Sequence, residues 1–379
     1  MPKDRDLFVL MCRLLAAPES GPPPEDADLD RSEADWARLI YIANLHYAAP
    51  LLYDAVQGRG LLARLPEDIR GYLIAIRHAN AERNDDIRRQ VEDFLPALNA
   101  AGIEPILLKG GAFLFADPDY GGSRMMVDID FLVPPGTEET AWDVMAGIGY
   151  RAIDDDDYSR AHQMNAIHRE GAVATIEIHR TPGPQRTLLT VEDAYADSAM
   201  VAAEGGRCRV MSTDHGVRHA LFHGQVQDFH YWFARPQLRT LLDLRRYIET
   251  HGPEIDWANV VHRFDDEGYG RVVEGTMALL HAWLGVEPPA AVPLTGRSRS
   301  YVERCTGRLN RAERELTFWQ RWIGWVGVNM LPKRLAFRHR LEETGRLGRL
   351  PVLAARQAAF LAKMTSWPAR QLRRNRPGA

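Results

Sequence analysis

The chain has 379 residues, of which 45% are hydrophobic and 26% are charged, and its formal net charge is −4. These values are typical of a globular chain with room for two or three domains, and they exclude the strongly basic balance of a general nucleic-acid-binding protein. The three cysteines, Cys12, Cys208 and Cys305, are far apart in sequence, which excludes a disulfide framework and a cysteine metal site and favours a reducing compartment.

The first region, residues 1–101, is predicted to be mainly helical. Apolar residues recur at helical spacing over residues 7–16, 32–56 and 67–98. The proline-rich residues 19–30 predict a loop. The chain shows no signal-peptide pattern and no apolar run long enough to span a bilayer, so we expect a cytoplasmic protein.

The second region, residues 102–212, is predicted to be mixed, and it opens with a strand, a glycine turn and a helix. A short apolar stretch is followed by Lys109, Gly110 and Gly111 and then by an apolar helix. Glycines let the backbone approach a phosphate, and the start of a helix favours an anion. Lys109 adds a positive charge, and Arg124 adds a guanidinium group suited to phosphate oxygens. These residues therefore predict a nucleotide-binding turn.

Two acids, Asp128 and Asp130, lie one residue apart in the next predicted strand, which is otherwise apolar. Because strand side chains alternate, both carboxylates point the same way, with Cα atoms about 6.6 Å apart. Carboxylates so placed can bridge two divalent ions at the spacing that phosphoryl-transfer sites require. Burying both acids without cations would be costly. The strand therefore predicts a metal site.

The ordered set Lys109-Gly110-Gly111, Arg124 and Asp128-Ile129-Asp130 resembles the DNA polymerase β-type nucleotidyltransferase superfamily. Within it, the set is most similar to uncharacterised bacterial nucleotidyltransferases with the signature LKG…R…DIDLLV, over roughly residues 30–250. The resemblance implies an α+β fold, with a small mixed sheet and helices as its core and helical regions on the N-terminal and C-terminal sides. It also implies that the paired acids bind metal with a third acid from a neighbouring strand. The family commonly carries serine where Gly111 stands, so one hydroxyl contact to the triphosphate is missing or is replaced by Lys109.

Glu177 is the candidate third acid. Residues 174–179 alternate in polarity, with Glu177 and His179 on one face. Alone, this pattern also fits an edge strand with a solvated polar face. After the paired acids, its Glu-x-His ending resembles the third-acid strand of the family, so Glu177 is expected to bind metal with Asp128 and Asp130. His179 is expected to orient the substrate or accept a hydroxyl proton, or else to support the site by hydrogen bonding.

Four consecutive acids at residues 154–157 are a second place where metal binding could be considered. They follow a predicted strand and are expected to lie in a loop. A run of acids there is more typical of solvated surface than of a metal site. We expect them to serve as the third ligand only if Glu177 does not.

The third region, residues 213–290, is predicted to be helical. His215, His219 and His223 recur every four residues and therefore share one helix face. Zinc binding is an alternative, but the glutamate of the metalloprotease motif is absent. In the resembling family a similar helix precedes one with a Leu-x-Asp motif, matched here by Asp243. His219, His223 and Asp243 are therefore expected to form a wall of the substrate site.

The last region, residues 291–379, combines tryptophans with a basic tail. Trp319, Trp322 and Trp325 occur in one short stretch, and from Lys333 onward twelve lysines and arginines accompany two acids. Such a segment can contact an anionic membrane surface or a protein partner. It can also bind nucleic acid, or be a helix packed on the body with a mobile tail.

Together these features predict a nucleotidyltransferase with two Mg²⁺ ions. It would transfer a nucleoside monophosphate from an NTP, such as ATP, to a hydroxyl-bearing acceptor and release pyrophosphate. The acceptor is expected to be a small molecule, peptide or saccharide rather than nucleic acid. Two alternatives remain: a toxin of the abortive-infection type that modifies RNA, and a catalytically degenerate nucleotide-binding scaffold. The C-terminal tail also fits a peripheral contact of the protein with the inner membrane surface.

Overall fold

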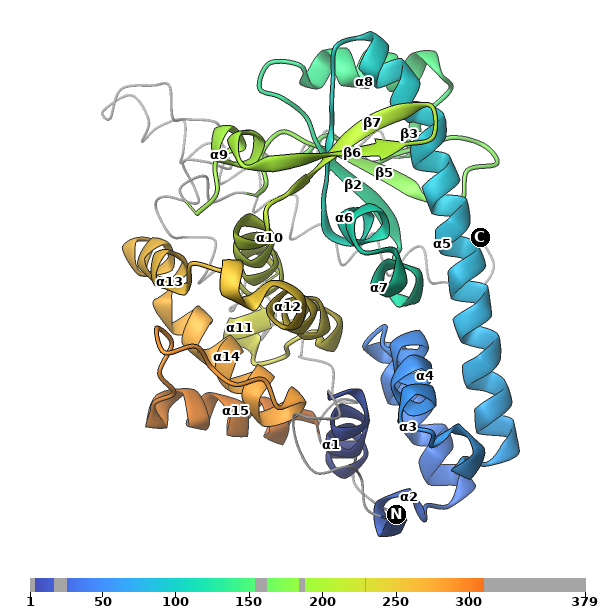
Figure 1. Cartoon of the computed structure of the whole chain (residues 1–379), viewed down its shortest axis with the longest axis vertical. Coiled ribbons are helices and arrows are strands. Elements are labelled where there is room, and N and C mark those ends of the chain that lie inside the picture. The colour runs from blue at the N-terminus through green and yellow to red at the C-terminus, as the bar shows by residue number, and fades with distance from the viewer. Residues whose placement is uncertain (1–3, 17–25, 154–161, 184–187, 229, 310–379) are drawn as a thin grey trace, which may run out of the picture. The chain divides into compact units, whose positions relative to one another are not determined.

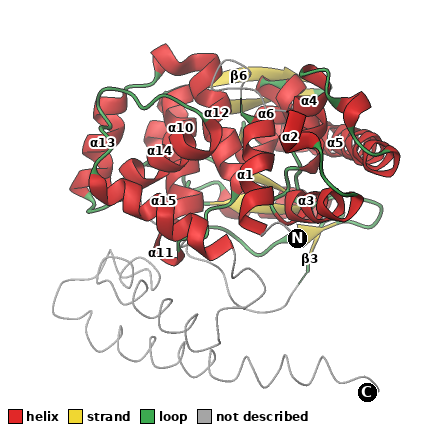
Figure 2. Ribbon diagram, turned by 90° about the horizontal axis from the view of Figure 1, so that it is seen from below, coloured by secondary structure: helices red, strands yellow, loops and turns green. Residues whose placement is uncertain are grey.

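Seven strands form one mixed sheet, and most of the remaining described residues are helical (Figures 1 and 2). The computed structural model describes residues 4–16, 26–153, 162–183, 188–228 and 230–309, all within one compact unit, Met1–Glu315. The acids at 154–157 and the tail that contains Trp319, Trp322 and Trp325 lie outside the described residues.

The described strands all lie between α5 and α10 in the chain, with helices before, among and after them. The strands are β1 (Ile106–Leu107), β2 (Asp128–Leu132), β3 (Arg151–Ala152), β4 (Ile167–His168), β5 (Thr175–His179), β6 (Ser198–Ala203) and β7 (Gly206–Met211). The α-helices are α1 (Asp4–Leu15), α2 (Asp26–Leu29), α3 (Glu33–Leu45), α4 (Ala49–Gly58), α5 (Glu67–Ala100), α6 (Lys109–Ala116), α7 (Pro118–Ser123), α8 (Glu138–Gly147), α9 (Val191–Ala196), α10 (Thr213–Ala220), α11 (His230–Phe233), α12 (Leu238–His251), α13 (Trp257–Asp266), α14 (Gly270–Leu284) and α15 (Gly296–Leu309). Two 3₁₀ helices, η2 (Leu62–Arg64) and η4 (Gly252–Glu254), and one π-helix, η3 (Leu221–Gln227), complete the set.

The strand order in the sheet is β3-β4-β5-β2-β1-β7-β6. β2 runs parallel to β5, and β1 runs parallel to β7, whereas the other neighbours are antiparallel. The central position of β2 and β5 explains why their sequences are so apolar. Strands with neighbours on both sides and covered faces must bury most of their side chains.

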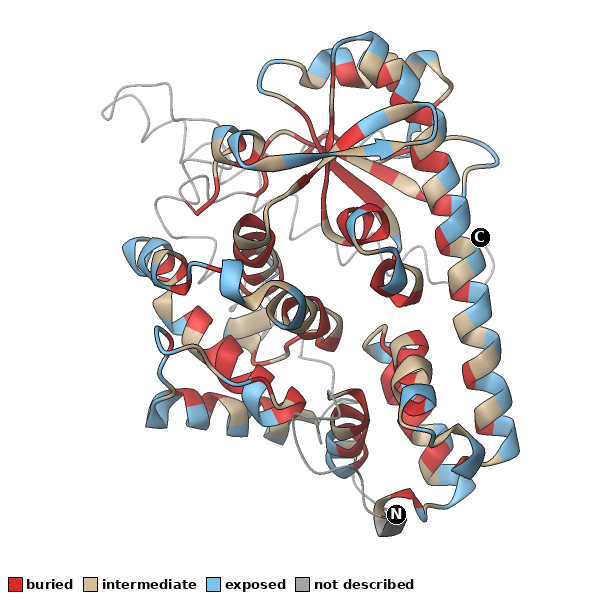
Figure 3. Cartoon of the chain, in the orientation of Figure 1, coloured by how far each residue is buried: buried red, intermediate tan, exposed pale blue. Residues whose placement is uncertain are grey.

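One face of the sheet is covered by the C-terminal part of α5 and by α8. Ile129 and Phe131 of β2 and Ile176 and Ile178 of β5 belong to this buried cluster. Their exposure is zero, and their strand neighbours point to the opposite face because side chains alternate. Figure 3 shows buried residues, in red, along the middle strands of the sheet. This packing holds β2 and β5 in place and leaves their polar residues together on the other face.

The helices that precede the strands in the chain and those that follow them share one apolar core. This cluster joins residues of α1, α3 and α4 to residues of η3, α12, α13, α14 and α15. Phe8 of α1 and Trp283 of α14 meet edge to face, with ring centroids 4.8 Å apart. Helix α5 extends from these helices to the sheet (Figure 1). No described helix is both long enough and apolar enough to cross a membrane.

The α+β fold and most elements predicted from the sequence are confirmed. The helical spacing over residues 67–98 corresponds to α5, and the strands predicted around Asp128 and Glu177 are β2 and β5. The helical spacing over residues 32–56 corresponds to two helices, α3 and α4, because the chain turns between them at Tyr47, which has a φ of 56°. One detail was wrong. Part of the loop predicted over residues 19–30 is the short helix α2.

Candidate active site

The acidic residues meet on two neighbouring parallel strands. Asp130 of β2 pairs in register with Glu177 of β5, and Asp128 pairs with Thr175. Paired residues of adjacent strands point to the same face, so Asp128, Asp130, Glu177 and His179 share the face opposite α5. Strand pairing thus brings together side chains that are almost fifty positions apart in sequence.

Asp130 is the most enclosed of these acids, with 2% of its surface exposed. Its Oδ1 accepts a hydrogen bond from Lys109 Nζ at 2.8 Å and lies 2.8 Å from His179 Nε2. Burial favours the neutral carboxyl, but Lys109 and His179 outweigh burial and hold the pKa of Asp130 well below its usual range. Burial opposes the charged form of Lys109, but the carboxylates of Asp130 and Asp128 outweigh burial and raise its pKa. The two residues form a buried ion pair.

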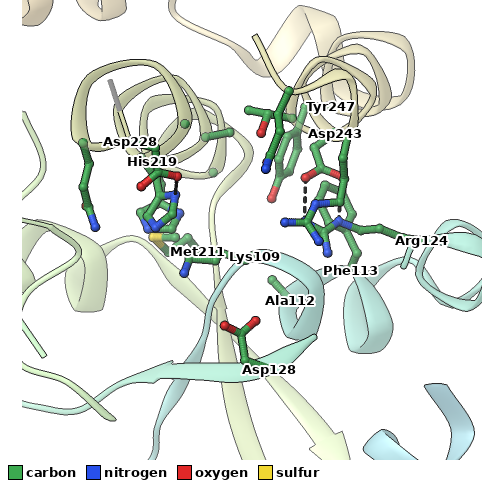
Figure 4. Close-up of a pocket in the computed structure, with 18 of the residues that line it drawn as sticks. Lys109, Ala112, Phe113, Arg124, Asp128, Met211, His219, Asp228, Asp243 and Tyr247 are labelled. Atoms are coloured by element: carbon green, nitrogen blue, oxygen red, sulfur yellow. Dashed lines mark hydrogen bonds and ion pairs between the residues drawn. The ribbon is translucent and has the colours of Figure 1, made fainter. Parts of the chain in front are cut away.

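Asp128 has no such partner. Burial raises the pKa of its carboxyl, and repulsion by Asp130 raises it further. Asp128 points into the cavity described below (Figure 4). Two neighbouring carboxylates repel each other, and a cation bound between them relieves the repulsion. The surroundings of Asp128 are therefore those expected of a metal ligand.

Three side chains in this cluster can hold a cation together. Asp130, Glu177 and His179 each offer a ligand atom, and these atoms lie within 4.8 Å of one another. The group differs from the predicted set of Asp128, Asp130 and Glu177, because the His179 ring reaches from the end of β5 to Asp130. Carboxylate oxygens suit Mg²⁺, and a mixed oxygen and nitrogen set also suits Mn²⁺.

His179 was expected to orient substrate or accept a proton, or to support the site by hydrogen bonding. Its side chain is fully buried, and its Nε2 is already in contact with Asp130. Its Nδ1 is buried and has no hydrogen-bond partner among the described residues. Of the expected roles, this contact favours hydrogen bonding to the Asp130 carboxylate.

The glycine turn has a different geometry from the one expected. Gly110 and Gly111 lie in the first turn of α6, and Lys109 is the residue with the left-handed backbone, at a φ of 50°. Non-glycine residues adopt this conformation at a cost of about 1 kcal/mol, and such positions cluster at functional sites. A Cβ at Gly110 would lie 2.3 Å from Met126 Sδ, whereas a Cβ at Gly111 would make ordinary contacts. The family's usual serine would thus fit at position 111.

A cavity of about 310 Å³ lies over this face of the sheet. Lys109, Asp128 and Glu177 line it on the sheet side, and residues of α10, η3 and α12 line it on the other. Figure 4 shows His219 and Asp228 on one side of the cavity and Arg124, Asp243 and Tyr247 on the other, with Asp128 below. All predicted wall residues, His219, His223 and Asp243, line it.

Arg124 was predicted to bind phosphate. Its Nε and Nη2 donate to the two oxygens of Asp243 at 2.7 and 2.8 Å, and Tyr120 donates its hydroxyl to Asp243 at 2.8 Å. Burial opposes the charge of Arg124, but Asp243 more than compensates, so the pKa of Arg124 is raised. The pair joins the end of α7 to α12 and forms a fixed wall of the cavity. Only Nη1, 3.4 Å from the Met125 carbonyl, is left without a strong partner.

His219 and His223 carry unprotonated rings. Burial, then the charge of Lys109, lowers the pKa of His219 to about 3 and that of His223 well below its usual range. The His219 ring also hydrogen-bonds to the Pro182 backbone, while its Nε2 has no partner among the described residues. His215 instead lies 3.9 Å from Asp197. None of these histidines belongs to the metal-capable group found among the described residues.

The cavity also includes residues that were not predicted from the sequence, among them Gln163, Gln227 and Arg239. Arg239 donates to the Met125 carbonyl at 3.2 Å and stacks over the Tyr47 ring at 4.7 Å. No described carboxylate lies within ion-pair distance of it, which distinguishes it from Lys109 and Arg124. Its position four residues before Asp243 on one helix was the signal that could have identified it.

Residues 32–285 match the model of a protein family described as uncharacterised nucleotidyltransferase. The matched residues include the sheet and every residue that lines the cavity. No curated protein and no solved structure matches the chain.

Proposed function

The chain belongs to the family of uncharacterised nucleotidyltransferases, and we propose that it transfers a nucleoside monophosphate from an NTP to a hydroxyl-bearing acceptor, releasing pyrophosphate. One observation carries this proposal. Asp128, Asp130 and Glu177 share one face of two parallel strands, and Asp128 and Glu177 line the cavity beside Lys109. Acids on this face can hold divalent ions where a triphosphate can enter.

Asp128, Asp130, Glu177 and His179 would hold the metal, which we propose to be Mg²⁺. The donor set fits a divalent cation, because three ligand atoms already lie within 4.8 Å and the pKa of the nearby Asp128 carboxyl is raised by burial and by Asp130. When bound, the metal neutralises charge on the triphosphate and polarises the bond that breaks. Lys109 and His179 keep Asp130 ionised and fixed in orientation.

The triphosphate would lie between the start of α6 and α12. The first N–H groups of α6 have no partner within the helix, so they are available to phosphate oxygens. Lys109 adds a charge beside them, and Arg239 faces the same cavity without a carboxylate partner. Lys109 and Arg239 would therefore supply positive charge to the triphosphate. The charge of Arg124 is already paired with Asp243.

Labelled nucleotides test the proposed reaction. The purified chain is incubated with each α-labelled NTP, Mg²⁺ and cell extract, with and without EDTA. We expect label on an acceptor from at least one NTP, no label with EDTA, and no acceptor label when the γ-phosphate carries it. Transfer of γ-label would show a phosphoryl transfer instead. Label on RNA would favour the toxin, and nucleotide binding without any transfer would favour a scaffold.

Glu177→Gln is expected to lower turnover by about a hundredfold while nucleotide binding persists. Glutamine keeps the size of the side chain but removes the negative charge that holds metal. Turnover and nucleotide affinity are measured separately. Glu170→Gln, at an exposed position in the turn before β5, is the matched control and should behave as wild type. Unchanged turnover in Glu177→Gln would remove Glu177 from the metal site.

Arg239→Met is expected to raise the KM for the NTP about tenfold, the equivalent of one lost charge-assisted hydrogen bond. Methionine retains the stem that packs on Tyr47 but removes the charge. Arg239→Lys should keep most of the affinity, and Arg263→Met, at an exposed site on α13, should have no effect. An unchanged KM in Arg239→Met would show that Arg239 does not contact the triphosphate.

A further inference from the structure

The cavity has two chemically different sides. Figure 4 places Arg124, Asp243 and Tyr247 on one side and His219 and Asp228 on the other. Arg239 belongs with the first side, because it contacts the Met125 carbonyl and its charge interacts with Arg124 and Asp243. Arg124 and Arg239, the arginines among the described lining residues, therefore both lie on the side of α12.

The side formed by α10, η3 and the segment before β5 carries no cation among the described lining residues. Instead it presents polar groups whose hydrogen bonds are unmet. His219 Nε2, Gln163 Oε1 and Gln227 Oε1 are all buried without a partner among the described residues. Gln163 and His219 are only 3% and 4% exposed. Buried polar atoms rarely remain unpaired, so three in one cavity indicate a ligand that pairs with them.

The hydrogen-bonding capacity of these atoms defines that ligand. His219 donates from its other nitrogen to the Pro182 backbone, so Nε2 is an acceptor. Gln227 Nε2 lies 3.1 Å from His162 Nε2, which leaves Gln227 Oε1 as an acceptor. Lys109, the cation whose charge acts on His219, is already paired with Asp130, and the other formal charges that line this side are the carboxylates of Glu177 and Asp228. A ligand here must donate hydrogen bonds, and an anionic group would meet these carboxylates with no cation on this side other than the paired Lys109.

We propose that Gln163, His219 and Gln227 form the acceptor subsite, and that the acceptor is an uncharged polyhydroxylated molecule of the saccharide or polyol class. This inference rests on the proposed nucleotidyl transfer. Gln163 lies in a bridge with His179 at the end of β5, so the subsite adjoins the acids. A hydroxyl held there attacks the α-phosphorus and forms the new P–O bond, the bond to pyrophosphate breaks, and the hydroxyl proton is released to solvent.

The test compares acceptors that differ in charge. The full chain is incubated with Mg²⁺, a mixture of α-labelled NTPs and one of three acceptor sets: neutral mono- and disaccharides, the same sugars as phosphate esters, and an RNA oligonucleotide. We expect label on neutral sugars and at least tenfold less on the other sets. Equal or greater labelling of phosphorylated sugars or RNA would overturn the proposal, as would no labelling of neutral sugars.

Variants test the named residues. Gln163→Met and His219→Phe should each raise the acceptor KM about tenfold or more without changing the KM for the NTP. His219→Gln, which retains an acceptor atom, should recover part of the loss. Gln57→Met, at an exposed site on α4, should behave as wild type. If Gln163→Met, which removes only the amide, leaves the acceptor KM unchanged, the subsite is elsewhere.

A nucleotide-binding measurement distinguishes failure of the acceptor subsite from failure of the proposed nucleotidyl transfer. Binding of α,β-methylene ATP and its GTP, CTP and UTP counterparts with Mg²⁺ is measured by calorimetry. Nucleotide binding without transfer to neutral sugars would overturn the acceptor subsite and leave the nucleotide site standing. Absence of any nucleotide binding would overturn both.

Discussion

Asp128→Asn should reduce nucleotide transfer by about a thousandfold or more and leave the protein folded. Among the described residues no cation lies at ion-pair distance from Asp128, and burial and then Asp130 raise its pKa more than Lys109 and Arg239 lower it. Its charged form therefore destabilises the metal-free protein, so replacing it with a neutral amide should maintain or raise the melting temperature. The measurements are turnover of α-labelled NTP and thermal unfolding in EDTA. Wild-type turnover would refute the metal assignment.

Asp130→Asn provides the contrast, because it should be equally inactive but less stable. Asp130 accepts a hydrogen bond from Lys109 and contacts His179, so its loss leaves a largely enclosed ammonium group without its partner. Breaking a buried ion pair from one side costs about 3 kcal/mol or more. Opposite changes in melting temperature for the two asparagine variants would distinguish the paired acid from the unpaired one. Equal changes would contradict this division.

Asp243→Leu should destabilise the protein by about 3–5 kcal/mol, because it leaves the Arg124 guanidinium buried and unpaired. The side chains of Arg124 and Asp243 are 6% and 9% exposed. Arg124→Met should have a similar effect. The combined variant should be less destabilised than the sum of the two, since both charges are removed together. Urea unfolding gives these free energies.

An exposed ion pair is the matched control for this cycle. Asp93 and Arg169 lie 2.5 Å apart, with side chains 54% and 31% exposed. Asp93→Asn should change the unfolding free energy by less than about 1 kcal/mol, because water screens the pair. If Asp243→Leu has an effect as small as this control, Arg124 is free to serve the nucleotide, as its sequence context predicted.

Local patterns in the sequence predicted the strands and the direction of their side chains. The alternation around Asp128 and around Glu177 is a property of a few consecutive residues, and each pattern placed its polar side chains on one face. That these faces would coincide depends on the pairing of Asp130 with Glu177. Such pairing joins distant segments and is selected by packing against α5 and α8, which no short window contains.

The ion pairs were the least predictable part of the site. Arg124 and Asp243 are 119 positions apart, and each had a plausible role of its own before the fold brought them together. A guanidinium group suits a phosphate and a carboxylate equally well, so the residue type could not decide between them. Lys109 is similar, because its backbone is left-handed, a conformation typical of glycine, and its side chain contacts Asp130.

The contact between Phe8 and Trp283 has a consequence for how the chain is made. All strands of the sheet lie between β1 and β7, so they can pair soon after residue 211 leaves the ribosome. Helix α1 is synthesised before the sheet, and its contact with α14 must wait for α14, a delay on the order of tens of seconds at about 5–20 residues per second. During that interval α1 can pack on α3 and α4, but the apolar contact of Phe8 with Trp283 is not yet made. Nascent chains of this protein should therefore depend on chaperones, and slower synthesis at low temperature should improve the yield of folded protein.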